Sequence, residues 1–231
     1  MTITVIIPTL NEERVIGRTL AHTGRLGFDA VTVVDGGSTD RTREIVEAAM
    51  APVGHRMRLV TSPKGRARQL NAGAAVSESD VLLFLHADTQ LPDNAREVVV
   101  KTLGDSTCVG GRFDVRFDAE TVIARTVARF MNLRSRLSGI STGDQALFVR
   151  RRVFEDLGRF ADIPLMEDIE FAHRLKRAGT VTALHDQVIT AYRRWQAQGP
   201  IRTILLMWTL RFLYWLGVSP FTLHKMYQAV R

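Results

Sequence analysis

Apolar and polar positions follow two different patterns along the first half of the chain. Apolar residues that recur every three or four positions predict helices, one through Ile45 and one over 66–75. Because strands that alternate with helices form sheets covered on both faces, the pattern predicts an α/β fold with a mostly parallel central sheet. The predicted strands are short runs of apolar and β-branched residues at 3–7, 30–34, 58–61 and 81–85.

The segment after the first strand predicts a helix that starts at Asn11. The Asn11 side chain would cap this helix, with Glu12 and Glu13 near the positive end of the helix dipole. Ile16 and Leu20 would lie on its buried face.

The second half of the chain is less regular. Strands are predicted at 110–116 and 145–149, helices at 120–136 and 168–177, and a loop of small residues at 139–144. We expect one domain over 1–199 and a C-terminal apolar helical segment over 200–231.

Composition adds a basic charge balance to this picture. The chain has 231 residues, with 31 Lys and Arg against 24 Asp and Glu. The excess favours an anionic partner, either nucleotide phosphates or acidic lipid headgroups, although solvated helix faces would also explain it. No nucleic-acid-binding motif is present, so we expect no nucleic acid partner. The single cysteine, Cys108, excludes a disulfide within the chain and suits the cytoplasm.

Polar residues follow three of the predicted strands, at 8–11, 35–40 and 86–88. In open α/β sheets, ligands bind beyond the carboxyl ends of the strands. The sequence therefore predicts a ligand site at this edge of the sheet.

The turn at 35–40 places a carboxylate, Asp35, beside Gly36, where the backbone lets a ligand approach closely. Asp35 could accept hydrogen bonds from the imide or ribose of a nucleotide, or it could only cap its own turn. The turn is neither a Rossmann fingerprint nor a P-loop.

His86 and Asp88 follow the apolar strand at 81–85, and side chains two residues apart on an extended segment point the same way. They could hold one divalent cation, since Mg²⁺ or Mn²⁺ prefers the carboxylate and Mn²⁺ also accepts imidazole. The alternative is that Asp88 caps the next turn.

Glu167 and Asp168 begin a predicted helix. One of the two carboxylates could act as a general base, or both could simply complement the helix dipole.

Two basic segments could hold phosphate. Lys64, Arg66 and Arg68 lie at the start of a predicted helix, where they could bind a diphosphate or form a solvated turn. Arg194 and Trp195 could grip phosphate and stack on a sugar, or form a surface corner.

The C-terminal stretch 204–218 is almost entirely apolar, but it is short for a membrane span and has Arg211 near its centre. An arginine at the centre of a span costs about 2.5–3.5 kcal/mol, which disfavours spanning. Two interpretations remain open. The stretch could lie in a membrane interface, with Trp208, Tyr214 and Trp215 at headgroup level, or it could pack on the domain or on a second copy in a homodimer.

Together, these motifs resemble family 2 glycosyltransferases of the GT-A fold. The resemblance rests on four segments in order: VIIPTLNE at 5–12, VVDGGSTD at 33–40, LHAD at 85–88 and ED at 167–168. Within the family, LHADT at 85–89, GDQA at 143–146 and RRW at 193–195 resemble a small bacterial subgroup described as radical-SAM- or selenodomain-associated. His86 replaces the first acid of the family's D-x-D motif, and Ala191 stands at the Gln position of the processive Q-x-x-R-W motif.

The resemblance implies an inverting transfer of a sugar from a nucleotide diphosphate sugar, UDP favoured and GDP the alternative, to a hydroxyl acceptor. It implies Asp168 as the general base beside Glu167, and Mn²⁺ or Mg²⁺ on Asp88 and His86. The nucleotide-binding residues would be Pro8, Thr9, Asn11, Glu12, Asp35, Gly36, Lys64 and Arg68, and the acceptor and diphosphate residues Gly111, Asp144, Arg194 and Trp195.

A lipid-linked acceptor would suit an enzyme held peripherally on the inner face of the cell membrane. Two other functions compete with the transferase. One is a catalytically inactive nucleotide-sugar-binding module at the membrane, and the other is a nucleotidyltransferase, which usually carries a Gly-rich basic loop after its first strand. Here that place holds Pro8, Thr9 and Asn11.

Overall fold

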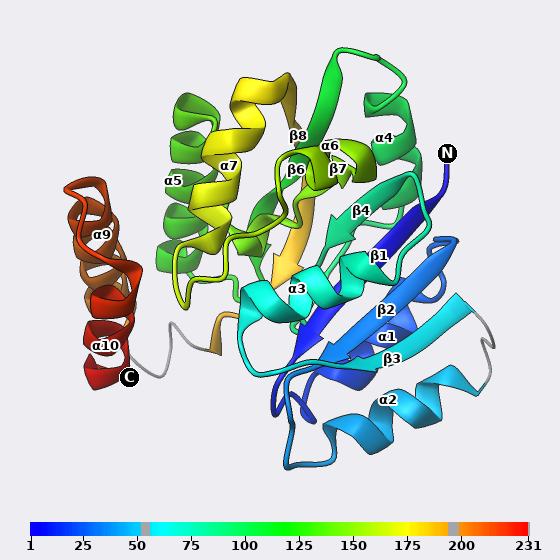
Figure 1. Cartoon of the computed structure of the whole chain (residues 1–231). Helices are drawn as coiled ribbons and strands as arrows, with labels where there is room; N and C mark the ends of the chain where they lie inside the picture. The colour runs from blue at the N-terminus through cyan, green and yellow to red at the C-terminus, as the bar shows by residue number, and fades with distance from the viewer. Residues whose placement is uncertain (52–55, 194–198, 231) are drawn as a thin grey trace.

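A computed structural model describes residues 1–51, 56–193 and 199–230 of the chain (Figure 1). Within these residues an eight-stranded sheet has the order β3-β2-β1-β4-β7-β6-β8-β5. Strands β1 to β4 run parallel, β7 is antiparallel to its neighbours β4 and β6, and β8 is parallel to β6. The strands are β1 (Ile3–Thr9), β2 (Ala30–Asp35), β3 (Met57–Thr61), β4 (Val81–Phe84), β5 (Thr89–Gln90), β6 (Cys108–Phe117), β7 (Phe148–Arg150) and β8 (Thr180–Thr190).

Helices cover both faces of the sheet. The core on one face receives side chains from α1, α2 and α4, and the core on the other from α3, α6 and α7. The first six helices are α1 (Ile16–Thr23), α2 (Thr42–Met50), α3 (Arg66–Ala75), α4 (Ala95–Thr102), α5 (Val122–Ser138) and α6 (Arg151–Asp156). The remaining helices are α7 (Glu167–Ala178), α9 (Pro200–Trp215) and α10 (Pro220–Val230). The expected α/β architecture is confirmed.

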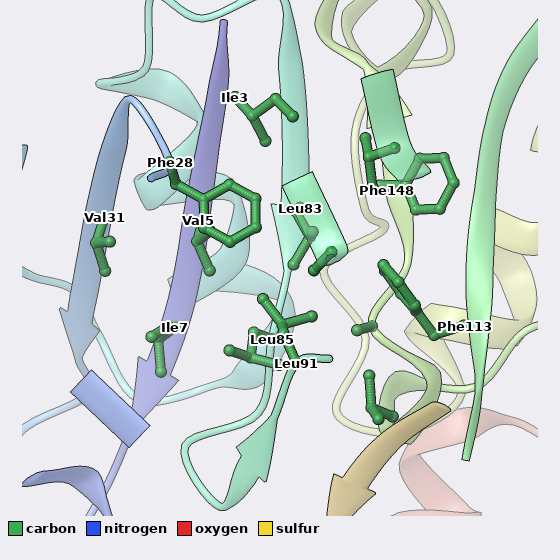
Figure 2. Packing of buried hydrophobic residues seen from close by; sticks show 14 of the residues in the cluster. Ile3, Val5, Ile7, Phe28, Val31, Leu83, Leu85, Leu91, Phe113 and Phe148 are labelled. Carbon is green, nitrogen blue, oxygen red and sulfur yellow. The ribbon is translucent and has the colours of Figure 1, made fainter. Parts of the chain in front are cut away.

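Strand β1 is buried on both faces, as its mostly apolar and β-branched sequence predicts. Ile3, Val5 and Ile7 point to the face of α1 and meet Leu83 of β4 (Figure 2). Ile6 points the other way, into the core beneath α3. This double burial fixes β1 at the centre, so its carboxyl end lies between those of β2 and β4.

The predicted helix start at Asn11 is wrong. Helix α1 begins at Ile16, and Asn11 adopts a left-handed backbone conformation with φ of 55°. Its side-chain oxygen accepts a hydrogen bond from the backbone N–H of Thr39 at 2.9 Å instead of capping a helix. Asn11 therefore joins the loop after β1 to the loop after β2, a role that asparagine suits because it tolerates this conformation.

Strand β8 and helix α6 of the second half were not predicted, and one predicted strand is shorter than expected. Strand β8 was not predicted because burial along it is mixed and bulges interrupt its register with β6, which blurs the period of two. The predicted strand at 145–149 is shorter, since Gly143–Gln145 form a 3-10 turn before β7.

The C-terminal helices pack on the domain near the start of α7 (Figure 1). Leu210 of α9 and Leu223 of α10 are fully buried against Met166 and Ile169. Among the helices that the structure describes, none is long and apolar enough to cross a membrane. The boundary at residue 199 stays a prediction.

We expect Gly73→Ala to lower the thermal midpoint. A Cβ at Gly73 would lie 2.5 Å from Ile6 and 3.0 Å from Val34, so α3 could no longer sit as closely on the sheet. Overpacking of this kind costs about 1–3 kcal/mol, more than the helix propensity gained from alanine. The control is Gly17→Ala in α1, whose Cβ would meet only a methyl group of Ile45, at 3.3 Å. Equal midpoints for the two variants in calorimetry would contradict the close packing of α3.

Candidate functional site

The carboxyl ends of β1 and β2 are tied together by a buried glutamine that sequence reasoning missed. Gln69 of α3 donates from its side-chain nitrogen to the carbonyls of Thr9 and Val34, both at 2.8 Å. Gly36 leaves room for it, since a Cβ there would lie 2.9 Å from the Gln69 amide. The carboxyl ends of β1 and β2 are therefore held rigidly together at one side of the site.

Asp35 is fully buried at the end of β2. Its carboxylate accepts hydrogen bonds from the backbone N–H of Gly37 at 3.1 Å and from the Ser38 hydroxyl at 2.5 Å. The Ser38 N–H also donates to it, at 3.1 Å. Asp35 thus organises its own turn, and its contact with a nucleotide stays a prediction.

The loop after β1 is held to the loop after β2 by further hydrogen bonds. The backbone N–H of Asn11 donates to the Ser38 hydroxyl at 3.0 Å, and that of Glu12 donates to the Thr42 hydroxyl at 2.8 Å. Pro8 lies beside Val34 in the parallel pairing of β1 and β2. The predicted residues Pro8, Asn11 and Glu12 are therefore brought to one place, beside the Asp35 turn.

Asp88 and Glu12 share one arginine. The Nη2 atom of Arg193 lies 2.5 Å from the Glu12 carboxylate and 3.6 Å from the Asp88 carboxylate. Burial alone would lower the pKa of Arg193, but the two carboxylates outweigh it and raise that pKa. The positively charged side chain of Arg193 thus lies between two carboxylates, Glu12 from the loop after β1 and Asp88 from the loop after β4.

This donor set fits a hard divalent cation. Mg²⁺ and Mn²⁺ bind carboxylate oxygens and complete their coordination with water and substrate phosphates. Among the described residues no group of three His, Cys, Asp or Glu side chains could hold a metal. A metal contact of Asp88 therefore stays a prediction.

Arg66, the first residue of α3, lies at the centre of a second cluster. Its Nη1 atom is 2.6 Å from the Glu167 carboxylate and 3.7 Å from that of Asp168. Its Nη2 atom is 2.5 Å from Nε2 of His86. The helix that follows β3 is thereby linked to the start of α7 and to the loop after β4.

The two ring nitrogens of His86 have different roles. A guanidinium only donates, so Nε2 accepts the hydrogen bond from Arg66. Nδ1 then carries the hydrogen and faces the Asp144 carboxylate at 3.3 Å. Both nitrogens are engaged by protein groups, so a metal on His86 would require Arg66 or Asp144 to move.

Asp168 is held by backbone groups. One oxygen accepts from the N–H of Gly143 and the other from the N–H of Ile169, both at 2.8 Å. Both bonds fix the orientation of the carboxylate. One side of the carboxyl group remains open, because the Asp168 side chain keeps 21% of its surface exposed.

Helix α7 is anchored by aromatic packing just beyond these acids. The ring of Phe171 lies 5.2 Å from Phe154 and 4.8 Å from Phe160, measured between centroids. These contacts are separated along the chain and bury the inner face of the helix. They fix the position of the start of α7, and with it the positions of the Glu167 and Asp168 side chains.

The charges in this cluster perturb one another. Burial raises the pKa of Glu167, Asp168 adds to this effect and Arg66 opposes it. Burial opposes the charge of Arg66, but the carboxylates of Glu167, Asp168 and Asp144 outweigh it and raise its pKa. Burial lowers the pKa of Arg134 in α5, although Asp168 and Asp144 attract its charge. Two arginines therefore lie within the field of the proposed base.

Gly143 makes the cluster sterically feasible. A Cβ at this position would lie 1.6 Å from Nη2 of Arg66 and 2.6 Å from Nε2 of His86. Gly143 was not predicted as a site residue, and Arg66 was expected only as one of three cations that could bind a diphosphate. The available signals were the glycine preceding Asp144 and the arginine between Lys64 and Arg68.

The remaining predicted residues are not brought into these clusters. Lys64 is exposed, and Arg68 pairs with Asp162 at 2.8 Å. Gly111 lies inside the sheet, where a Cβ would strike Phe148 at 2.4 Å, so close packing accounts for the glycine. Arg194 and Trp195 lie outside the described residues. The ligand contacts expected of these residues stay predictions.

We expect the Arg66–Glu167 pair to show strong energetic coupling. Arg66→Met would leave the buried Glu167 carboxylate without its partner and lower the free energy of unfolding by about 2–3 kcal/mol. Adding Glu167→Gln would recover part of this loss, with a coupling energy of about 1–3 kcal/mol in urea denaturation. The surface pair Arg152–Asp156, with atoms 3.8 Å apart, is the matched control and should show little coupling. If the changes in unfolding free energy of the two single variants simply add in the double variant, Arg66 is not the stabilising partner of Glu167.

Comparison of this sequence with known proteins identifies related glycosyltransferases. The model of glycosyl transferase family 2 matches residues 4–158. The probable glycosyltransferase YdaM of Bacillus subtilis is 30% identical over 201 residues, which are 77% of this chain and 47% of that protein. Glycosyltransferase AglJ of Haloferax volcanii is 31% identical over 132 residues, or 55% and 42% of the two chains. The chain thus spans about half the length of these curated relatives or less.

Solved structures share the fold. S. aureus TarS 1-349 in complex with UDP has a TM-score of 0.68 at 19% identity, covering 83% of this chain and 60% of that one. The mannosyltransferase PcManGT from Pyrobaculum calidifontis, in complex with GDP-Man and Mn²⁺, has a TM-score of 0.66 at 22% identity. That match covers 90% of this chain and 64% of the other. At these identities the likeness establishes the architecture alone.

Proposed function

Since the chain belongs to glycosyl transferase family 2 and is therefore a glycosyltransferase, we propose that it moves a sugar from a nucleotide diphosphate sugar to a hydroxyl acceptor, inverting the anomeric carbon. The observation that supports this most is the setting of Asp168. Its two oxygens accept backbone hydrogen bonds while one side stays open to a substrate. A carboxylate held in this way is oriented before an acceptor arrives.

The donor would bind at the joined loops after β1 and β2. The hydrogen bonds that link Asn11 to Ser38 and Thr39 form a rigid shelf beside the Asp35 turn. Structures of the same fold hold UDP or GDP-Man, which supports a nucleoside diphosphate group here. UDP is the favoured donor nucleotide and GDP the alternative.

The transfer would be a single displacement. The Asp168 carboxylate takes the proton from the acceptor hydroxyl as its oxygen attacks the anomeric carbon. The bond from that carbon to the diphosphate oxygen breaks on the opposite face, and its electron pair leaves with the nucleoside diphosphate. One displacement inverts the configuration, and no enzyme nucleophile is required.

Asp88 would hold Mn²⁺ or Mg²⁺, which when bound neutralises charge on the departing diphosphate. Arg193 stands beside Asp88 at 3.6 Å and can also face a phosphate. Arg66 would act on the other side of the site, holding Glu167 and Asp168 in place and balancing their charge.

We expect one nucleoside diphosphate to raise the thermal midpoint in a metal-dependent way. The panel is UDP, GDP, dTDP and CDP, each with Mn²⁺, Mg²⁺ or EDTA, because a ligand that binds only the native state stabilises it by mass action. Asp88→Asn should abolish the metal-dependent part of the rise. Asp93→Asn, which changes an exposed carboxylate in the same loop region, should keep it. No rise with any nucleotide for the folded wild type would argue against a donor site.

We expect Asp168→Asn to retain nucleotide binding and lose turnover. Removing a general base lowers a rate by about 100- to 10,000-fold, while the amide preserves the shape of the side chain. The measurement is release of the nucleoside diphosphate from sugar donors that carry the nucleotide identified by the panel, with water replacing the acceptor hydroxyl. Asp156→Asn, at an exposed position, is the control. Unchanged turnover in Asp168→Asn would remove Asp168 from the mechanism, and a wild type that binds without turnover would favour the binding module.

A further inference from the structure

Helix α9 is apolar on two opposite faces. Its inner face packs on the domain, where Leu210 is fully buried among Met166, Ile169 and Leu223. Its outer face is a stripe at helical spacing whose five large side chains are each 57–78% exposed. This outer stripe consists of Ile201, Leu205, Trp208, Phe212 and Trp215. An amphipathic surface helix needs only the inner face, so burial on the domain does not account for the stripe.

Helix α5 adds a second exposed apolar set on the same flank. Ile204 of α9 packs against Ala124, Val127 and Ala128 of α5, so the two helices are neighbours (Figure 1). The exposed residues of α5 are Val122, Ile123, Phe130, Leu133 and Leu137. Exposed apolar surface of this kind marks a site of contact with a protein or a membrane.

The charge of this flank selects between those partners. Helices α5, α9 and α10 contain seven of the 31 Lys and Arg and none of the 24 Asp and Glu. The other 24 basic residues therefore equal the acidic residues in number. Of the seven, Arg136 pairs with Asp114 at 2.7 Å and Arg134 is attracted by Asp168 and Asp144, and the other five leave this flank basic. Two copies joined through it would bring like charges together, whereas an anionic surface would be attracted.

A cavity beside α5 suits a phosphate group. It has a volume of about 370 Å³ and lies between α5 and the end of β6. Its charged lining comprises Arg116, Arg125 and Arg129, with Glu120 as the one acid. Within α9, Arg202 and Arg211 border the outer stripe, since each lies three positions from one of its members, Leu205 or Trp208.

We propose that the flank formed by α5, α9 and α10 binds an anionic membrane surface, with the outer stripe of α9 inserted at the headgroup boundary. Trp208 and Trp215 suit that depth, because tryptophan has a large apolar ring and one polar group. The basic residues meet the lipid phosphates and add to the burial of the stripe. This inference is independent of the proposed reaction.

The test is co-sedimentation of the full chain with vesicles, without donor or acceptor. Vesicles of phosphatidylcholine mixed with phosphatidylglycerol should carry the protein into the pellet, and vesicles of phosphatidylcholine alone should do so far less. Trp208→Ser with Trp215→Ser should abolish binding without lowering the thermal midpoint, since both side chains are exposed. Raising the salt concentration should weaken binding by the wild type.

A matched pair of charge variants separates a local site from net charge. Arg202→Gln with Arg211→Gln should lower partitioning by about fivefold for each charge removed. Arg41→Gln with Arg152→Gln removes the same charge from side chains that are 76% and 93% exposed elsewhere, and should partition like the wild type. Equal losses in both double variants would overturn the assignment. A wild type that stays in the supernatant would also overturn it. If light scattering then shows a dimer that Trp208→Ser with Trp215→Ser dissociates, the outer stripe joins two copies instead.

Discussion

The guanidinium of Arg66 is the contact on which the site depends. It joins α3 to Glu167, 101 residues further along the chain, and it also touches His86 after β4. A buried carboxylate without a partner is costly, so Arg66 must stay beside Glu167 for the Glu167 carboxylate to remain charged. The proposed base at Asp168 and the histidine of the metal motif are therefore coupled through one side chain.

Packing far from the chemistry sets the position of this guanidinium. Gly73 lets α3 lie close on the sheet, and Gln69 locks the same helix to the carboxyl ends of β1 and β2. The Phe171 ring, packed on Phe154 and Phe160, holds α7 opposite. Both helices are fixed before a substrate binds, which is the condition for electrostatic groups to act without reorganisation.

The proposed membrane-binding flank and the candidate site are different surfaces of the molecule, but they share contacts through α9. Outside α5, α9 and α10 the chain has equal numbers of basic and acidic residues, and within those helices it is basic and apolar. Met166 and Ile169, which bracket Asp168 in sequence, also receive the buried face of α9. Helix α9 therefore links the proposed membrane-binding surface to the residues on either side of the proposed base.

The sequence by itself determined the α/β fold, helix α3 and the polar strand ends, because periodicity and turn chemistry are local properties. It also placed Asp88 and Asp168 within ordered motifs. Only the tertiary structure decided that Asn11 bridges two loops, and that Gly143 leaves space for Arg66, since these partners are distant in sequence. It likewise decided which face of α9 is exposed. A helix that is apolar all round has no periodic contrast, so its buried face depends on what it packs against.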